Sequence, residues 1–333
     1  MGVLRRSFLL IVFVPSVLLA EEPLELQSWL GEQEWMRDTE GPILSLGSEG
    51  EFDETHMFAP AVANTDDRFQ LWYCGSRGKV AERVFSMGLA TSSDGRVFES
   101  TPTTGVQLWQ WQALRPDAHV AAESGWDDLL QEGKLRMWFS STWFEGETGL
   151  HTLHETASVD GVNWSAPSEP RLEILYAPSV LKVGDDYRMW YTDVSAEPWK
   201  FRHASSHDGR HWKVTDEPVM IIDQAWEKSR LFYPTVLKVD DAYLMWYGSY
   251  WTGRENTTAL GFAVSQDGLM WHKHPANPVL RPDPERPWES HYVTSQSVMR
   301  LDDGSFRMWY ASRKQPPFVN KYFAINTAVW VPK

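Results

Sequence analysis

The chain has 333 residues, of which 42% are hydrophobic, and its formal net charge is −14. This composition is typical of a folded globular protein. The acidic balance argues against nucleic-acid binding, because neutralising phosphates requires clustered Lys and Arg side chains. Cys74 is the only cysteine, which excludes an intramolecular disulfide, and its place after "LWY" predicts a buried apolar side chain.

The N-terminus is typical of an export signal. Arg5 and Arg6 precede the apolar run "SFLLIVFVPSVLLA", which ends at Ala20 before the acidic "EEP". A membrane span needs about 20 apolar residues, and this run is shorter and contains Pro15. We therefore expect residues 1–20 to be a cleaved signal peptide and the mature protein to be secreted or periplasmic, with no membrane attachment. Either the general or the twin-arginine route fits the sequence.

A tryptophan motif is repeated through the rest of the chain. It occurs as "QLWYCGS", "RMWFSST", "RMWYTDV", "LMWYGSY" and "RMWYASR", at intervals of 52 to 66 residues. Before three of these copies, a proline twelve residues upstream opens a short β-rich run. A period of this length indicates a fold built from repeated units. The five tryptophans are Trp72, Trp138, Trp190, Trp246 and Trp309.

A second motif follows four of the tryptophans, as "SSDGRVF", "SVDGVNW", "SHDGRHW" and "SQDGLMW". Its Asp-Gly pair supplies a tight hairpin turn, and its aromatic residue is placed to pack on the outgoing strand. Each repeat then contains about four strands and no helical period, which is the pattern of a propeller blade. We predict an all-β fold, with one five-bladed β-propeller domain over residues 21–333.

In the fifth repeat no Asp-Gly turn follows the tryptophan, because "FAINTAVWVPK" ends the sequence where that turn and the outer strand should follow. The N-terminal "WMRDTEGPIL", from Trp35 to Leu44, matches "WHKHPANPVL", from Trp271 to Leu280. The N-terminus is therefore predicted to supply the outer strand of the last blade and to pair near Trp330. Such a clasp closes the ring and buries a strand edge that would otherwise favour aggregation.

The motifs "P-S-V-L-K … Y-x-M-W-Y" and "S-x-D-G-x-x-W" resemble those of the five-bladed glycosidase superfamily, which includes arabinanases, β-xylosidases, invertases and levansucrases (glycoside hydrolase families 43 and 32). The resemblance covers almost the whole mature chain. It implies glycoside hydrolysis by an Asp base on the inner strand of blade 1, a tuning Asp on blade 2 and a Glu acid on blade 3. Fold alone does not fix function, so these catalytic roles have to be checked against the residues at the matching positions.

In a propeller the inner strands line a central channel, and a ligand site is expected where the segments leading into these strands depart from their repeat. The aromatic–acid pairs Phe52-Asp53, Trp226-Glu227 and Trp288-Glu289 recur at one spacing, which favours packing and turn-capping roles. Other residues in these segments break the repeat and are predicted to converge on one rim. They are His56, Arg115, Asp117, His119, Glu173, Arg230 and His291.

Glycosidic cleavage requires two carboxyl groups. Asp117 falls close to the blade 2 position that the resemblance implies, with Arg115 near enough to hold it ionised. The family would show its base aspartate just before the proline of blade 1, where this sequence has Ala59. Ala177 stands at the equivalent position before the proline of blade 3. Neither the base nor the acid of the family therefore has a match at its usual position. The candidate catalytic carboxylates are Asp53, Asp117, Glu173 and Glu227.

Aromatic residues in a second set of rim loops favour a sugar ligand, because exposed rings can stack on the C–H face of a sugar. Packing between blades is the alternative for each of these rings. The predicted substrate-binding residues are His56, Arg115, His119, Trp143, Arg230, Trp251, Arg254 and His291.

The sequence predicts an exported glycoside hydrolase acting on a plant or algal poly- or oligosaccharide. A non-catalytic carbohydrate-binding propeller is an alternative, and so is a sugar phosphorylase in which Arg115, Arg230 and Arg254 form a phosphate pocket. No cofactor is predicted, because the histidines lack ligand spacing, although His291 could help to hold a Ca²⁺ ion in the central channel, as in some family members. The oligomeric state is not predicted.

Overall fold

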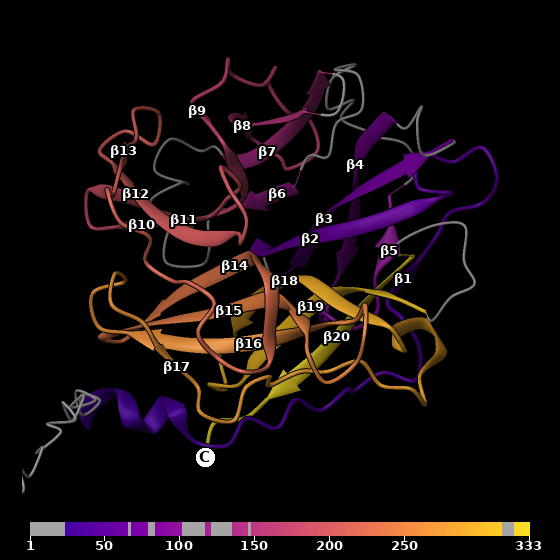
Figure 1. Ribbon diagram of the computed structural model, residues 1–333. Helices are drawn as coiled ribbons and strands as arrows, with labels where there is room; N and C mark the ends of the chain where they lie inside the picture. Colours follow the sequence, from indigo (N-terminus) through magenta and orange to yellow (C-terminus); the bar gives the residue numbers. More distant parts are fainter. Residues whose placement is uncertain are drawn as a thin grey trace, which may run out of the picture.

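The computed structural model describes residues 24–65, 68–78, 84–101, 117–120, 135–145, 148–314 and 323–333. Five four-stranded antiparallel sheets are arranged in a ring (Figure 1). The predicted all-β five-bladed propeller is therefore confirmed. The predicted signal peptide, residues 1–20, lies outside the described residues. In the described part of the chain, no helix combines the length and apolar character that crossing a membrane requires.

Each blade is one sheet whose strands follow one another from the axis outward. Blade 1 contains β2 (His56–Thr65), β3 (Arg68–Arg77), β4 (Val84–Ser92) and β5 (Glu99–Ser100). Blade 2 contains β6 (Asp117–Val120), β7 (Leu135–Glu145), β8 (Thr148–Ser158) and β9 (Leu172–Glu173). Blade 3 contains β10 (Leu175–Val183), β11 (Asp186–Asp193), β12 (Lys200–Ser206) and β13 (Lys213–Val214).

Blade 4 contains β14 (Glu227–Val239), β15 (Ala242–Trp251), β16 (Thr258–Ser265) and β17 (His272–Lys273). Blade 5 contains β18 (Tyr292–Arg300), β19 (Phe306–Arg313), β20 (Ala324–Trp330) and the N-terminal β1 (Leu44–Ser45). Among the described residues, two short 3₁₀ helices, η1 (Leu24–Leu30) and η5 (Pro287–Glu289), lie outside the sheets. The first strands of neighbouring blades contact one another around the ring, so β2, β6, β10, β14 and β18 surround the axis.

The repeated tryptophans join neighbouring blades. All five are buried, as expected from their equivalent positions in the repeat, and Cys74 is buried as well. Four of them donate an indole N–H hydrogen bond of 2.7 to 2.9 Å to the glycine carbonyl of the next blade's Asp-Gly turn. The pairs are Trp72 with Gly161, Trp138 with Gly209, Trp190 with Gly268, and Trp309 with Gly95.

The Asp-Gly turns have a shape that suits this contact. In the turn of blade 2, the Asp160 carboxylate accepts hydrogen bonds from the backbone N–H groups of Val162 and Asn163, while the Ser158 hydroxyl accepts one from Gly161 N–H. Gly161 has a φ of +72°, and a Cβ added to it would lie 2.8 Å from the Trp72 ring. Glycine is therefore required both by the backbone conformation and by the close approach of the neighbouring blade.

The predicted clasp is confirmed. Met36 exchanges two backbone hydrogen bonds of 2.8 Å with Val329, and β1 pairs with β20. The interface between blades 4 and 5 has no Asp-Gly turn, and Trp35 instead packs edge-on against Trp246, with ring centroids 6.1 Å apart. The Trp246 indole N–H has no hydrogen-bond partner among the described residues. Ring closure therefore replaces a hydrogen bond with an aromatic contact.

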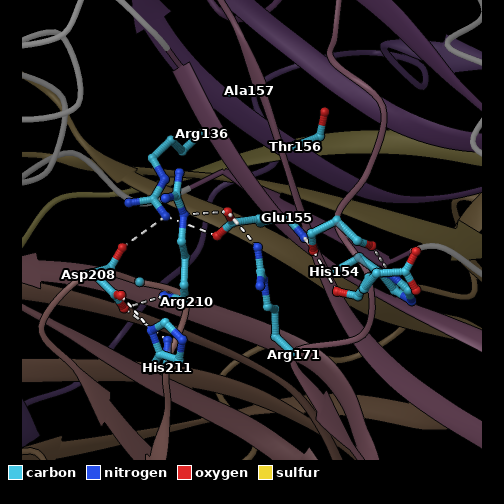
Figure 2. A network of polar contacts seen from close by, with 12 residues as sticks. Arg136, His154, Glu155, Thr156, Ala157, Arg171, Asp208, Arg210 and His211 are labelled. Carbon is cyan, nitrogen blue, oxygen red and sulfur yellow. Dashed lines mark hydrogen bonds and ion pairs between the residues drawn. The ribbon is translucent and has the colours of Figure 1, made fainter.

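Charged side chains add a further link between blades 2 and 3, which Figure 2 shows. The Glu155 carboxylate on β8 pairs with Arg136 at 3.0 Å, Arg210 at 3.0 Å and Arg171 at 3.4 Å. Arg136 also donates a 3.1 Å hydrogen bond to the backbone carbonyl of Asp208 in the next blade's turn. The network fixes the turn of blade 3 against blade 2, at the outer side of the ring.

Candidate functional site

A cavity of about 290 Å³ lies where the five blades converge. Its volume is at the small end of the range for ligand pockets. Every blade contributes to its wall, so it lies at a mouth of the central channel. The lining residues are His56, Phe58, Thr142, His151, Tyr176, Trp199, Arg230, Phe232, Tyr233, Tyr250, Thr258 and Thr294.

One register position supplies a lining residue in four blades. This residue pairs with the residue two positions after the blade's central tryptophan, in the pairs Phe58–Cys74, Tyr176–Thr192, Phe232–Gly248 and Thr294–Ala311. In blade 2 the same position is Asp117, which pairs with Ser140. The Asp117 side chain lies outside the described part of the structure, but its backbone holds the register position that lines the cavity elsewhere.

The residue after this register position is Ala59 in blade 1 and Ala177 in blade 3, and its backbone conformation accounts for these two alanines. Ala59, Ala177, Tyr233 and Ser295 have left-handed backbone conformations, with φ between 44° and 53°. The strand register shifts at this point in each of the four blades. The extra residue turns the strand at the channel mouth, so Ala59 and Ala177 occupy positions set by the backbone.

Aromatic rings from blades 3 and 4 form one wall of the cavity. The hydroxyls of Tyr176 and Tyr233 are hydrogen-bonded at 2.6 Å, and the Tyr176 ring lies 6.0 Å from Trp199. Phe232 packs edge-on against Tyr250 at 5.7 Å. Trp199 and Tyr250 lie in the rim loops whose aromatic residues are expected to face a sugar, whereas Tyr176, Phe232 and Tyr233 were not predicted as ligand contacts. The signal in the sequence is the aromatic residue two positions before the blade proline, in "YAP" and "FYP".

Of the predicted site residues, the structure brings His56 and Arg230 together in the cavity. The His56 ring stacks on Phe58 with centroids 4.7 Å apart. The Arg230 guanidinium lies 4.0 Å above the Trp199 ring and pairs with Glu197. The cavity therefore combines flat apolar faces with donors placed differently in each blade.

The recurring acids lie elsewhere. Asp53 is buried and accepts a 2.8 Å hydrogen bond from the Tyr73 hydroxyl, and burial raises the pKa of its carboxyl. Glu227 accepts a matching bond from Tyr247 and caps a turn by accepting the backbone N–H groups of Asp223 and Gln224. This geometry supports the structural interpretation of the repeated aromatic–acid pairs. Neither Asp53 nor Glu227 lines the cavity, and their catalytic roles stay predictions without support from position.

Other predicted residues are also outside the cavity wall. Glu173 is exposed on β9, the outermost strand of blade 2, and Trp251 is half-buried with Arg281 over its ring at 5.6 Å. Arg254 donates a 2.9 Å hydrogen bond to the carbonyl of Ser290. The contacts of Trp251 and Arg254 are with neighbouring loops and not with the cavity.

His291 is buried, and its Nδ1 lies 3.1 Å from Arg313. Burial lowers the pKa of His291 to about 4, assisted by the positive charges of Arg313 and Arg254. Within the described residues, no group of three or more His, Cys, Asp or Glu side chains is arranged to hold a metal ion, and a Ca²⁺ ion near His291 stays a prediction. Arg115 lies outside the described residues, as do the side chains of His119 and Trp143.

Comparisons with known proteins agree with this architecture. A family model described as the glycosyl hydrolases family 32 N-terminal domain matches residues 178–331. The uncharacterized proteins MT1551 and Rv1502 of Mycobacterium tuberculosis, from strains CDC 1551 / Oshkosh and ATCC 25618 / H37Rv, are each 26% identical over 240 residues. Those alignments cover 68% of this chain and 77% of each relative.

Solved structures share the fold over nearly the whole chain. The BT0996 RGII complex has a TM-score of 0.72 and 16% identity, covering 91% of this protein and 93% of that one. A structure from work on the GH130 family of mannoside phosphorylases, which contains glycoside hydrolases that target β-1,2 mannosidic linkages in Candida mannan, has a TM-score of 0.67 and 15% identity, covering 90% and 94%.

A putative glycoside hydrolase from Parabacteroides distasonis has a TM-score of 0.66 and 14% identity, covering 91% of this protein and 97% of that one. The chain is a five-bladed β-propeller that is similar in fold to glycoside hydrolases. The resemblance predicted from the repeats is thereby confirmed. At these identities the structural likeness establishes the fold, and the reaction is a separate question.

Proposed function

We propose that this propeller binds a carbohydrate in the cavity at the channel mouth and hydrolyses a glycosidic bond there. The observation that carries the proposal is the cavity wall itself. Aromatic side chains from blades 3 and 4 line the cavity together with polar groups that differ from blade to blade, including His56, Thr142 and Thr258. Such a wall suits a sugar, which presents an apolar C–H face and hydroxyls in fixed directions.

Asp117 is the residue we assign to the chemistry. Its register position is the one that lines the cavity in the other four blades, where Phe58, Tyr176, Phe232 and Thr294 stand. A carboxyl at this position would meet the sugar beside the aromatic wall. Protonation of a leaving oxygen and activation of water both use a carboxyl group, so Asp117 would serve as one member of the required pair.

A second candidate function is binding without cleavage. None of the described residues that line the cavity carries a carboxylate, whereas hydrolysis by the usual route requires two. A phosphorylase would need one protein carboxyl fewer, because phosphate replaces the attacking water and needs no base. Hydrolysis consumes water, phosphorolysis consumes phosphate, and binding alone consumes neither.

The test is a screen of plant and algal oligosaccharides and aryl glycosides, with and without inorganic phosphate, using the full chain. Release of free reducing sugar without phosphate supports hydrolysis, and release of a sugar phosphate only when phosphate is present supports phosphorolysis. Retention on a glycan array without any product supports binding alone. A folded protein that neither binds nor cleaves any carbohydrate would overturn the proposal.

We also propose that the chain is exported, from the Arg5, Arg6 and apolar pattern of residues 1–20. Fractionation of cells expressing the full chain and a chain lacking residues 1–20 tests this. Export only of the full chain, with a shorter mature form, is expected. Equal retention of both chains inside the cell would contradict it.

A further inference from the structure

We call the cavity at the channel mouth the axial cavity, and two histidines, His56 and His151, line it. Among the described lining residues, these are the side chains that exchange protons near neutral pH, because arginine and tyrosine do so only at much higher pH. Hydrolysis requires two groups that transfer protons, and Asp117 is proposed as one of them. The other is therefore expected to be one of these histidines.

The two histidines are held in different ways. His56 is only 1% exposed, and its ring stacks on Phe58 with centroids 4.7 Å apart, as a packing group does. His151 is half-buried on β8, its Nδ1 is hydrogen-bonded to the Thr142 hydroxyl at 2.8 Å, and the Tyr176 ring lies 5.6 Å away at 73°. Since Thr142 engages Nδ1, the proton that His151 transfers is the one on Nε2.

His151 also departs from the repeat. It pairs with Thr142, the fourth residue after the tryptophan of blade 2, and the partner of that fourth residue differs between blades. The partners are Phe85 in blade 1, His151 in blade 2 and Thr258 in blade 4. Asp117 pairs with Ser140, two residues before Thr142 on β7, so the first and third strands of blade 2 carry its two departures at the same end of the sheet.

We infer that His151 is the general acid of the cleavage and Asp117 its base, an inference that rests on the proposed function. The protonated imidazole gives its Nε2 proton to the glycosidic oxygen while the bond from that oxygen to the anomeric carbon breaks, with the electron pair going to the oxygen. Water forms the new bond to this carbon and passes a proton to the Asp117 carboxylate. Protonated Asp117 and neutral His151 then return to their starting forms by exchanging a proton through solvent.

The surroundings of His151 include groups of both signs. The titratable or charged residues that line the cavity with it are His56 on β2, Tyr176 on β10, Arg230 and Tyr233 on β14, and Tyr250 on β15. The positive charge of Arg230 is paired with Glu197, which reduces its effect on an imidazolium. Blade 2 itself carries carboxylates at Asp117 on β6 and at Glu173 on β9, and negative charge favours the protonated imidazole.

The pH dependence of kcat/KM tests the role of His151, measured with the full chain on the glycoside found in the screen. The wild-type rate should fall as the acid loses its proton, with a midpoint between about pH 5.5 and 7.5, the ordinary range for histidine. His151→Asn should lower kcat by about 100-fold and remove this fall at high pH.

A pair of aryl glycosides of the same sugar separates proton donation from positioning. The phenyl glycoside needs a proton on its leaving oxygen, whereas 2,4-dinitrophenol leaves as a stable anion. The loss of about 100-fold in His151→Asn is expected with the phenyl glycoside and should shrink to about 5-fold or less with the dinitrophenyl glycoside. A group that only positions the sugar would give equal losses.

His154→Asn is the matched control, because it makes the same change three residues further along β8. The His154 ring stacks on Phe139 with centroids 5.5 Å apart, its Nε2 is hydrogen-bonded to the Thr152 hydroxyl and its Nδ1 to the Ser168 carbonyl, each at 2.8 Å. It is not among the residues that line the cavity. This variant should keep the wild-type kcat and the fall at high pH.

Three results would overturn the role of His151 alone: a wild-type rate without a fall in that pH range, an unchanged kcat in folded His151→Asn, or equal losses on the two aryl glycosides. The wild-type profile needs no variant, so it tests the role even where His151→Asn does not fold. A folded wild type that cleaves no glycoside, with or without phosphate, would overturn the proposed cleavage and this inference with it.

Discussion

Two kinds of acidic position differ in their relation to the repeat. Asp53, Glu227 and Glu289 recur in blades 1, 4 and 5, are buried, and each accepts a hydrogen bond from the tyrosine that follows the blade's tryptophan. Asp117 has no acidic counterpart, since the other blades carry Phe, Tyr or Thr at its register position.

The difference separates structure from function. A group that recurs at one position does the same task in each blade, and here the task is to hold the segment leading into the inner strand against the second strand. A group that breaks the repeat has no such shared task. Because an asymmetric ligand needs different contacts from each blade, the departures from the repeat are where a site is expected.

The largest effect should come from Asp117→Asn, which removes a charge without changing the size of the side chain. We expect turnover of the substrate found in the screen to fall by about 10³-fold, because general acid–base groups contribute roughly 10²- to 10⁴-fold. The melting temperature should stay within about 2 °C of the wild type, since the substitution keeps the size and shape of the side chain. The measurements are kcat and thermal unfolding.

Asp53→Asn is the matched comparison, because it makes the same chemical change at a recurring position. It should lower the melting temperature and leave kcat of the folded protein near the wild-type value. Unchanged hydrolysis by Asp117→Asn, or a loss of kcat in Asp53→Asn without a loss of stability, would break the distinction between the two positions.

The next largest effect is expected in Glu289→Gln. Glu289 is fully buried and pairs with Arg37 of the clasp and with Arg286. Removing its charge leaves two guanidiniums without their counter-charge, which should lower the free energy of unfolding by about 3 kcal/mol. Urea denaturation measures this, with the exposed Glu285→Gln as the control. A change below about 1 kcal/mol would show that the recurring acid is not structural.

Gly161→Ala should have a smaller effect. Its Cβ would lie 2.8 Å from the Trp72 ring at a φ of +72°, so we expect about 2 kcal/mol of destabilisation from crowding and backbone strain. Gly184→Ala has a similar φ of +63° with no atom within 4 Å of the new Cβ, and it should cost about 1 kcal/mol. Equal losses in the two variants would mean that the blade contact adds nothing.

The smallest effect concerns pH. The backbone N–H and side-chain amide of Asn163 hold the pKa of Asp160 below its ordinary value of 3.8. The ionised carboxylate stabilises the folded state above that value, and this contribution is lost as the pH falls through the lowered pKa. Between pH 5 and pH 2 the melting temperature of the wild type should fall more than that of Asp160→Asn, by on the order of 1 °C, because the group is exposed. Parallel curves would contradict this.

The fold could be predicted because the repeat consists of large, buried residues at regular spacing. The five tryptophans, the Asp-Gly turns and the match between Trp35–Leu44 and Trp271–Leu280 specified the blades and the clasp. The turns themselves do more than reverse the chain, since their glycine carbonyls bind the preceding blade's tryptophan. That contact joins residues about 70 to 90 positions apart in three of four cases, and no local pattern reveals it.

The site was predicted only in part, for a physical reason. His56 and Arg230 broke the repeat and line the cavity, but Tyr176 and Phe232 also line it while following the repeat. A position can recur because the backbone turns there and still face the cavity. Conversely, Trp251 was predicted to bind sugar from its place in a loop, and its half-buried ring lies beneath Arg281 and outside the cavity wall. Which face a side chain presents depends on the strand register, which the sequence spacing alone does not give.

The most direct test of the site is a crystal structure of the full-length mature protein with the best-binding oligosaccharide from the screen. The account predicts one sugar ring in the axial cavity against Tyr176 and Phe232, with an Asp117 carboxyl oxygen within about 3.2 Å of a sugar oxygen. A sugar bound outside the cavity, or a cavity sugar with Asp117 out of reach, would contradict it.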